Sequence, residues 1–234
     1  MADPLPVYDV RALLFDLDGT LVDSRRDLAT ALDLTLSELG LPSLGVEVVT
    51  RFVGDGARRL VERGLTAACP DKFFSEDFVT EALERFKAHY AQCLLATTQP
   101  YPNVVAVLEH FAALPKAVVT NKPVAFSEAI LQGLGLRAYF VGVIGGDTLP
   151  ERKPHPAPVL AGLVACGVAD PSAAVMIGDS PNDIRAGRAA GTRTCGVTYG
   201  FRAAHELAEA DIVIDDLSRL RESFRASTTG GFAP

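Results

Sequence analysis

Short apolar segments alternate with helical patterns over most of the chain after residue 102. The helical patterns cover residues 103–114, 123–134, 157–166 and 182–190, and the apolar segments cover residues 117–120, 141–144, 174–177, 194–197 and 211–214. Strand, helix and strand repeated in this way predict a parallel sheet with right-handed crossovers and helices on both faces. Residues 12–15 form another unbroken apolar run, which is typical of a parallel strand buried on both faces. We therefore expect an α/β fold built on a doubly wound parallel sheet that includes this first strand.

The segment between the first strand and the rest of the sheet has only helical periodicity. Leucines recur at helical spacing over residues 28–39, and further helical patterns cover residues 57–65 and 75–94. Ser24 stands just before the first pattern, and Asp27 lies three positions after Ser24, which predicts a capping box. The segment is therefore expected to be an all-helical insertion.

An insertion of this kind divides the chain into two predicted domains. Residues 1–22 and 98–234 would form the α/β catalytic core, and residues 23–97 would form a helical cap that determines substrate specificity.

The composition narrows the classes of function. Of 234 residues, 48% are hydrophobic and 22% are charged, with a formal net charge of -7, as in a soluble globular protein. This acidity argues against a general nucleic-acid or membrane-surface role, although a metal and a few basic groups can still attract an anion locally. The four cysteines are scattered, which predicts reduced thiols and no zinc site. With no membrane-length apolar run and no signal-peptide pattern, we expect a cytoplasmic protein.

The first strand ends in residues that can carry chemistry. Asp16 and Asp18 are two positions apart, so in extended backbone both side chains lean to one side. Two like charges this close repel, and a divalent cation between them would relieve the repulsion. Gly19 allows a sharp turn toward a ligand, and Thr20 offers a hydroxyl. We expect a nucleophilic aspartate, a second aspartate for proton transfer and a metal here, with an ordinary acidic turn as the alternative.

Three further segments place polar groups where the sheet would bind a ligand, at strand ends or in adjoining loops. Thr120 and Asn121 follow an apolar run, where a hydroxyl and free backbone N–H groups can hold phosphoryl oxygens. Lys153 lies in a polar loop and could offset the charge of a nucleophile and a phosphate. Asp179 and Asp183 lie one helical turn apart and add oxygen ligands that favour Mg²⁺ over zinc. The alternatives are helix caps and a solvated loop lysine.

Taken in order, these segments resemble the motifs of the haloacid dehalogenase superfamily of aspartate-nucleophile phosphatases. They are Asp16-Leu17-Asp18-Gly19-Thr20, Thr120-Asn121-Lys122, Lys153-Pro154 and Gly178-Asp179-Ser180-Pro181-Asn182-Asp183. The resemblance covers nearly the whole chain and implies a Rossmann-like core with a helical cap after the first motif.

The same resemblance implies a role for each residue. Asp16 would attack phosphorus and become a transient aspartyl-phosphate, and Asp18 would protonate the leaving oxygen and then deprotonate water. Thr120 would hold the phosphoryl group and Lys153 would neutralise its charge. Mg²⁺ would be held by the Asp16 carboxylate, the Asp18 backbone carbonyl and Asp179, with Asp183 near it or bound through water.

The cap is expected to select the phosphate ester. Gly54 and Gly56 flank a turn before a helix, whose free N–H groups would form an anion site if they faced the cleft, and Arg58 could add a fork for a carboxylate. A surface turn with solvated arginines is the alternative. Together with Tyr101-Pro102, this turn resembles bacterial phosphoglycolate phosphatases, which implies 2-phosphoglycolate as substrate.

Two residues depart from the pattern of the phosphoglycolate phosphatases. That family usually has glycine where Asn103 stands and often has asparagine where Asp55 stands.

Other activities stay open at this stage. An amino-sugar phosphate, pyrophosphate or nucleotide could be the substrate, or a sugar could accept the phosphoryl group as in a β-phosphoglucomutase. A phosphonatase would need a cap lysine in a glycine-rich loop, and neither Lys72 nor Lys87 lies in one. A catalytically silent binding protein is the alternative from another class. The expected partner is a small phosphorylated metabolite, without nucleic acid or membrane, bound by a monomer or homodimer.

Overall fold

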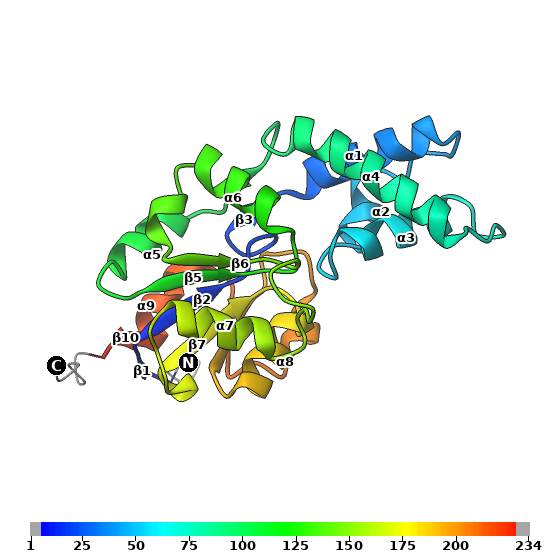
Figure 1. Cartoon of the computed structure of the whole chain (residues 1–234). Helices are drawn as coiled ribbons and strands as arrows, with labels where there is room; N and C mark the ends of the chain where they lie inside the picture. Colours follow the sequence, from blue (N-terminus) through cyan, green and yellow to red (C-terminus); the bar gives the residue numbers. More distant parts are fainter. Residues whose placement is uncertain (1–5, 228–234) are drawn as a thin grey trace.

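A six-stranded parallel sheet forms the centre of the protein, whose computed structural model describes residues 6–227 (Figure 1). Its strand order is β6-β5-β2-β7-β8-β9. The strands are β2 (Ala12–Phe15), β5 (Lys116–Val119), β6 (Gly142–Ile144), β7 (Ala174–Gly178), β8 (Arg193–Val197) and β9 (Ile212–Ile214). The chain runs from β2 to one edge and returns to β7, so the strand order reverses between β2 and β7. The predicted α/β fold with a doubly wound parallel sheet is confirmed, and this reversal is where such sheets bind ligands.

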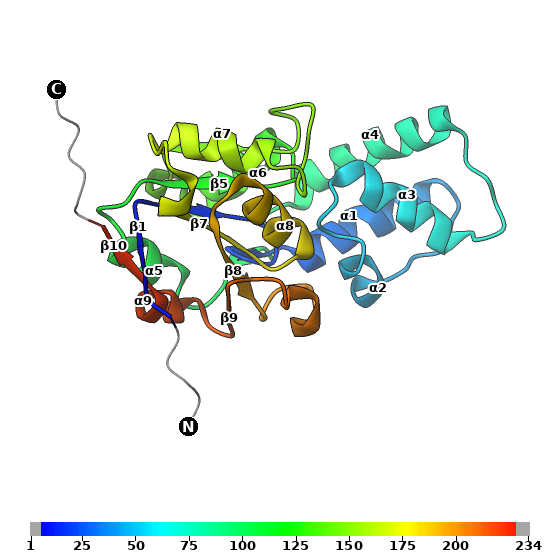
Figure 2. The ribbon, with the colours of Figure 1, turned by 90° about the horizontal axis from the view of Figure 1, so that it is seen from below.

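Helices cover both faces of the sheet. One face carries α7 (Ala157–Ala165) and α8 (Pro181–Ala190), and the other carries α5 (Val104–His110), α6 (Val124–Gly133) and the short α9 (Leu220–Ser223). Figure 2 shows α7 and α9 on opposite sides of the strands. The four longer helices agree with the sequence patterns to within a few residues at their ends.

The residues of β2 explain why the first strand reads as an unbroken apolar run. Leu13 and Phe15 pack into the core on the α5 and α6 side, whereas Ala12 and Leu14 pack on the α7 and α8 side. All four are fully buried. A strand covered on both faces has no solvent side, so it needs no polar alternation.

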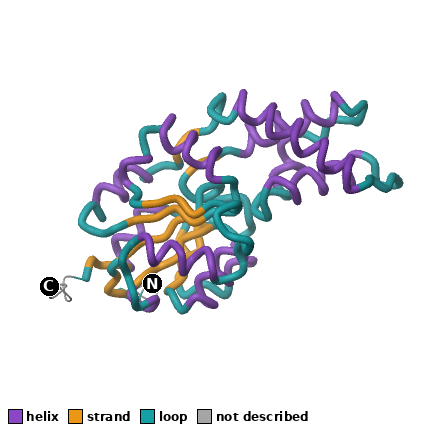
Figure 3. Tube along the Cα trace, viewed as in Figure 1, coloured by secondary structure: helices purple, strands orange, loops and turns teal. Residues whose placement is uncertain are grey.

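Four helices form a separate body beside the sheet (Figure 3). They are α1 (Arg25–Glu38), α2 (Val46–Thr50), α3 (Ala57–Ala68) and α4 (Glu76–Cys93). Their apolar faces pack on one another through buried residues such as Leu32, Val61 and Phe86. The expected all-helical insertion is observed, with α2 as an additional short helix that the sequence pattern did not indicate.

Two chain crossings connect this body to the sheet, and they pair as a two-stranded antiparallel ribbon. The ribbon consists of β3 (Val22–Asp23) and β4 (Gln99–Pro100). The domain boundaries expected from the sequence fall at or beside this ribbon. That the two parts are separate domains stays a prediction.

Asp27 ties the start of α1 to the second crossing. Its buried carboxylate accepts hydrogen bonds from the backbone N–H groups and the hydroxyls of both Thr97 and Thr98. Burial opposes ionisation, but these four donors lower the pKa of Asp27 below its ordinary value. The capping box predicted for α1 is therefore wrong: Ser24 precedes the helix, but its hydroxyl donates to Asp18, and Asp27 serves residues far along the chain.

Asn103 has left-handed backbone geometry, with φ of 67°. The family resemblance implies glycine at this position, and glycine adopts this geometry at least cost. Asparagine is one of the few other residues that tolerate it. Its side-chain amide also donates to both carboxylate oxygens of Asp216, at 3.0 Å each. The departure from glycine is thus compatible with the fold.

The remaining elements are short. A parallel pair joins β1 (Tyr8–Val10) to β10 (Phe224–Ala226), and the 3₁₀ turns are η1 (Arg137–Tyr139), η2 (Pro171–Ala173), η3 (Ala204–Leu207) and η4 (Leu217–Arg219). All four cysteines are free thiols, as expected, and two of them are buried. Within residues 6–227, no helix combines the length and the apolar character needed to cross a membrane.

Replacing Asp27 by alanine is expected to lower the free energy of unfolding by about 3 kcal/mol, because charge-assisted hydrogen bonds are lost and donors on Thr97 and Thr98 lose their acceptor. Urea unfolding at pH 7 measures the change. Asp33→Ala is the matched control: Asp33 lies on the same helix and accepts from two backbone N–H groups, but it is less buried, so a loss of about 1 kcal/mol is expected. Equal losses in the two variants would contradict the role given to Asp27.

Candidate active site

Three carboxylates from distant parts of the chain meet where the strand order reverses. Asp16 follows β2, Asp179 follows β7, and Asp183 lies in the first turn of α8. One oxygen from each lies within 4.8 Å of the other two, and all three residues are buried. The convergence expected from the sequence is observed.

The chemistry of these donors fits a hard divalent cation. All three are carboxylate oxygens, which suit such an ion better than zinc or copper. Burial and the neighbouring acids Asp183 and Asp16 raise the pKa of Asp179 well above its ordinary value. Burial also raises the pKa of Asp16 to about 6, although Lys153 opposes the shift. A bound cation would supply the positive charge that this cluster lacks.

Gly19 allows the loop after β2 to pass directly against Asp179. Its φ is +82°, and a Cβ atom at this position would lie 2.2 Å from the Asp179 carboxylate oxygen Oδ2. No larger residue fits without displacing that carboxylate. The sequence predicts a close approach of Gly19 to a ligand, and the structure places this glycine against a carboxylate of the candidate metal site.

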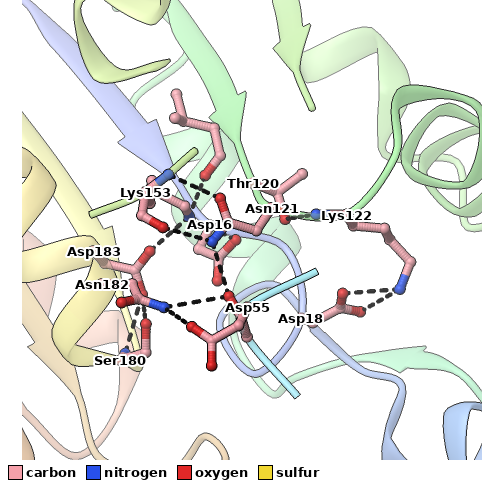
Figure 4. A network of polar contacts seen from close by, with 12 residues as sticks. Asp16, Asp18, Asp55, Thr120, Asn121, Lys122, Lys153, Ser180, Asn182 and Asp183 are labelled. Atoms are coloured by element: carbon pink, nitrogen blue, oxygen red, sulfur yellow. Dashed lines mark hydrogen bonds and ion pairs between the residues drawn. The ribbon is translucent and has the colours of Figure 1, made fainter. Parts of the chain in front are cut away.

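Lys153 is the positive group inside the cluster. Its Nζ lies 3.0 Å from Asp16 Oδ1 and 2.6 Å from Asp183 Oδ1, and its side chain is almost fully buried (Figure 4). Burial lowers the pKa of Lys153, but the two carboxylates outweigh this and raise it. Asp183 also accepts hydrogen bonds from the backbone N–H and hydroxyl of Ser180, at 3.0 and 2.7 Å. These contacts fix Lys153 beside the predicted nucleophile.

Thr120 and Asn121 occupy the loop after β5, and both line a cavity that also includes Asp16. The Asn121 side chain exchanges hydrogen bonds with the backbone of Lys153 and donates to the Gly54 carbonyl at 2.9 Å. Its amide therefore holds two loops in place around the predicted phosphoryl site. The Thr20 hydroxyl is buried and has no hydrogen-bond partner among the described residues.

Asp18 has a counter-charge of its own. Its two carboxylate oxygens lie 2.9 and 2.8 Å from Lys122 Nζ, and the Ser24 hydroxyl donates to one of them. Burial lowers the pKa of Lys122, but the Asp18 carboxylate raises it above the ordinary value. The idea that one cation lies between the Asp16 and Asp18 side chains is corrected: Figure 4 shows Asp18 directed to Lys122 and away from Asp183.

Lys122 is a residue to which the sequence patterns assigned no role. The available signal was its place directly after Thr120 and Asn121, within a recognised motif.

The turn at Gly54 and Gly56 closes the cavity from the cap side. The core residue Asn182 donates to Asp55 Oδ1 at 2.6 Å, and Arg202 donates to backbone carbonyls just before the turn. Asp55 also pairs with Arg63 at 2.6 Å. Burial opposes ionisation, yet the Asn182 hydrogen bond and the Arg63 pair lower the pKa of Asp55. Its charge is therefore compensated within the turn.

Arg58 does not join this group. Its guanidinium pairs with Glu62 at 3.0 Å and with Glu76, both on the cap, and it is absent from the cavity wall. The structure thus leaves Arg58 outside the cleft, because two neighbouring glutamates compete for its charge. Lys72 and Lys87 likewise do not line this cavity.

A family model of haloacid dehalogenase-like hydrolases matches residues 10–191. The chain belongs to this family. The resemblance inferred from the four motifs is confirmed.

Relatives of this hydrolase share most of its length. Phosphoglycolate phosphatase 1 of Pseudomonas aeruginosa is 41% identical over 214 residues, which cover 90% of this chain and 78% of that protein. The phosphoglycolate phosphatase of Colwellia psychrerythraea is 41% identical over 206 residues, which cover 87% and 91%. The crystal structure of a predicted phosphoglycolate phosphatase from Haemophilus somnus superposes with a TM-score of 0.85 at 35% identity, and covers 91% of this chain and 97% of that one.

The raised pKa of Asp16 predicts a pH dependence of stability in the metal-free hydrolase. The folded state holds this proton up to about pH 6, whereas the ordinary value is 3.8. The group therefore stabilises the fold below pH 4, and this contribution is lost as the pH rises through 6. Urea midpoints between pH 4 and pH 7 should vary less for Asp16→Asn than for the wild type. Asp33→Asn, a control on the cap, should keep the wild-type slope, and equal slopes for all three proteins would refute the prediction.

Proposed function

We propose that this hydrolase removes phosphate from 2-phosphoglycolate, giving glycolate and phosphate, with Mg²⁺ bound and Asp16 as the nucleophile. The observation that carries the proposal is the convergence of Asp16, Asp179 and Asp183 with Lys153 Nζ at 3.0 Å from the Asp16 carboxylate. The relatives named above support phosphoglycolate as the substrate.

The proposed reaction gives these side chains the roles that the family resemblance implies. An Asp16 carboxylate oxygen attacks phosphorus, and the bond from phosphorus to the glycolate oxygen breaks, which leaves an aspartyl-phosphate. Asp18 gives a proton to the departing oxygen and then takes one from the water that releases phosphate. Thr120 and Lys153 hold the phosphoryl oxygens, since this transfer depends mostly on positioning and charge stabilisation.

Mg²⁺ is the ion that the donor set suits best. Asp16, Asp179 and Asp183 would hold it, with the Asp18 carbonyl as a further proposed ligand. When bound, the ion would neutralise charge on the transferring group.

The cavity at Asp16 supports a small substrate. Its cap side is mostly apolar, with Leu60, Phe86 and Tyr90 on the wall. A sugar ring or a nucleoside would place hydroxyl groups against this apolar wall without hydrogen-bond partners, whereas a two-carbon acid would not. This favours phosphoglycolate over a sugar phosphate, a nucleotide or a phosphoglucomutase-like transfer.

The glycine turn is the proposed site for the carboxylate of the substrate. Gly54, Gly56 and Ala57 line the cavity, and α3 begins there without a side-chain cap. Backbone N–H groups at such a helix start favour an anion.

A panel of phosphorylated metabolites assayed with Mg²⁺ tests the substrate directly. Phosphoglycolate should have the highest kcat/KM, and a sugar phosphate or nucleotide that exceeds it would reject the assignment. A wild type that releases no phosphate from any ester would instead indicate a silent binding protein.

Asp16→Asn is expected to abolish phosphate release, by a factor of at least about 1,000, because an amide cannot act as the nucleophile. Its circular dichroism spectrum should match the wild type, and EDTA should inactivate the wild type until Mg²⁺ is restored. Asp33→Asn controls for loss of one negative charge. Substantial turnover by Asp16→Asn would remove Asp16 from the proposed role.

Gly56→Ala is expected to raise KM for phosphoglycolate about tenfold more than KM for p-nitrophenyl phosphate, which has no carboxylate. The residue has φ of +87°, and an added Cβ would lie 3.3 Å from the Asn121 carbonyl oxygen, so the turn must shift. Arg58→Ala is the matched cap variant. Since Arg58 pairs with Glu62 and Glu76, it should change both KM values by less than about twofold. If Arg58→Ala alone raised KM selectively for phosphoglycolate, the substrate carboxylate would be assigned to Arg58 instead.

A further inference from the structure

Tyr90 is a cap residue that reaches the charged groups of the core. It belongs to α4, is 1% exposed, and lines the cavity together with Asp18 and Lys122. Its ring centroid lies 4.7 Å from Lys122 Nζ, within the range of a cation–π contact. An aromatic face therefore covers the ammonium that pairs with Asp18.

The Tyr90 ring is held in this position from two sides. Phe86, one turn earlier on α4, stacks on it with centroids 5.8 Å apart and planes 6° apart. Phe126 of the core helix α6 contacts it edge to face, with centroids 5.1 Å apart. A ring fixed by packing can orient a charge without first losing its own freedom.

The contact with Tyr90 stabilises Lys122, because few hydrogen-bond acceptors surround its buried ammonium. Its side chain is 5% exposed, and its Nζ pairs with the two oxygens of Asp18, while the Tyr90 hydroxyl lies nearby without a well-aligned hydrogen bond. A buried ammonium with unused donors gains from an aromatic face, since that face replaces part of the lost water. The cap thus contributes directly to the pair that sets the direction of the Asp18 carboxylate.

We propose that Tyr90 is a positioning residue for the acid–base step. Its ring face holds the Lys122 ammonium against the Asp18 carboxylate, so Asp18 is correctly oriented only when the cap is in place. This inference rests on the proposed phosphatase function. The ring face that covers Lys122 is the proposed acting part, and the Tyr90 hydroxyl, which also lies near the Lys122 ammonium, is the alternative that the variants below separate from it. Loss of the ring should disturb the chemical step more than substrate binding.

Single substitutions separate the ring from the hydroxyl. Tyr90→Leu should lower kcat for p-nitrophenyl phosphate about tenfold or more, with KM changed less than about threefold. Tyr90→Phe should keep kcat within about threefold of the wild type, because it retains the ring. Tyr90→Met fills the same space and replaces Tyr90→Leu if that variant does not fold. Equal losses in Tyr90→Phe and Tyr90→Leu would overturn the proposal.

A double-mutant cycle tests whether Tyr90 acts through Lys122. In a Lys122→Met background, Tyr90→Leu should change kcat by less than about twofold, because the charge that the ring holds is gone. Val79→Ala is the matched control: it removes buried apolar atoms from the same helix at a position that does not line the cavity, so its effect should be additive with Lys122→Met. Additive effects for Tyr90→Leu as well would overturn the proposal.

Urea unfolding of the same proteins supplies a second cycle that needs no turnover. Coupling between Tyr90→Leu and Lys122→Met in the free energy of unfolding, without coupling for Val79→Ala, supports the contact even in an inactive protein. An inactive wild type would therefore count against the proposed function, whereas additive unfolding energies would count against this inference.

Discussion

Repulsion among three buried carboxylates is the constraint on which the rest of the site depends. Asp16, Asp179 and Asp183 lie close together at the sheet reversal, where water cannot screen their charges. Lys153 contributes one positive charge at 3.0 Å from Asp16. The remaining negative charge would be offset by the divalent cation proposed above, which would in turn attract a phosphoryl group. Gly19 has a fixed place in this arrangement because its missing side chain leaves room for Asp179.

The site contains two charge systems, each with its own lysine. Lys153 pairs with Asp16, the proposed nucleophile, and Lys122 pairs with Asp18. Separating them keeps the predicted acid–base carboxylate outside the metal cluster, although it is only two residues from Asp16. The two pairs also differ in which part of the protein surrounds them. Asp16, the proposed nucleophile, and Lys153 both belong to the core, whereas the pair of Asp18 and Lys122 lies under an aromatic ring of the cap.

The sequence predicts the sheet and the acidic cluster because their signals are local. A strand buried on both faces is apolar throughout, and parallel strands bring their carboxyl ends to one edge. Contacts between distant side chains carry no such signal. Asp27 fits a capping box in sequence, yet it binds Thr97 and Thr98. Arg58 stands beside a promising turn, but two glutamates compete for it. The partner that each of these side chains binds depends on contacts that form only in the folded chain.

The paired crossings β3 and β4 have a mechanical consequence. A body attached through one strand can swivel about it, whereas two hydrogen-bonded strands resist swivelling and still permit bending. Asp27 strengthens this joint because it binds the base of α1 to the residues that lead into β4. Bending at this ribbon would therefore move the helical body mainly along one direction, and closure would return Tyr90 to the same lysine.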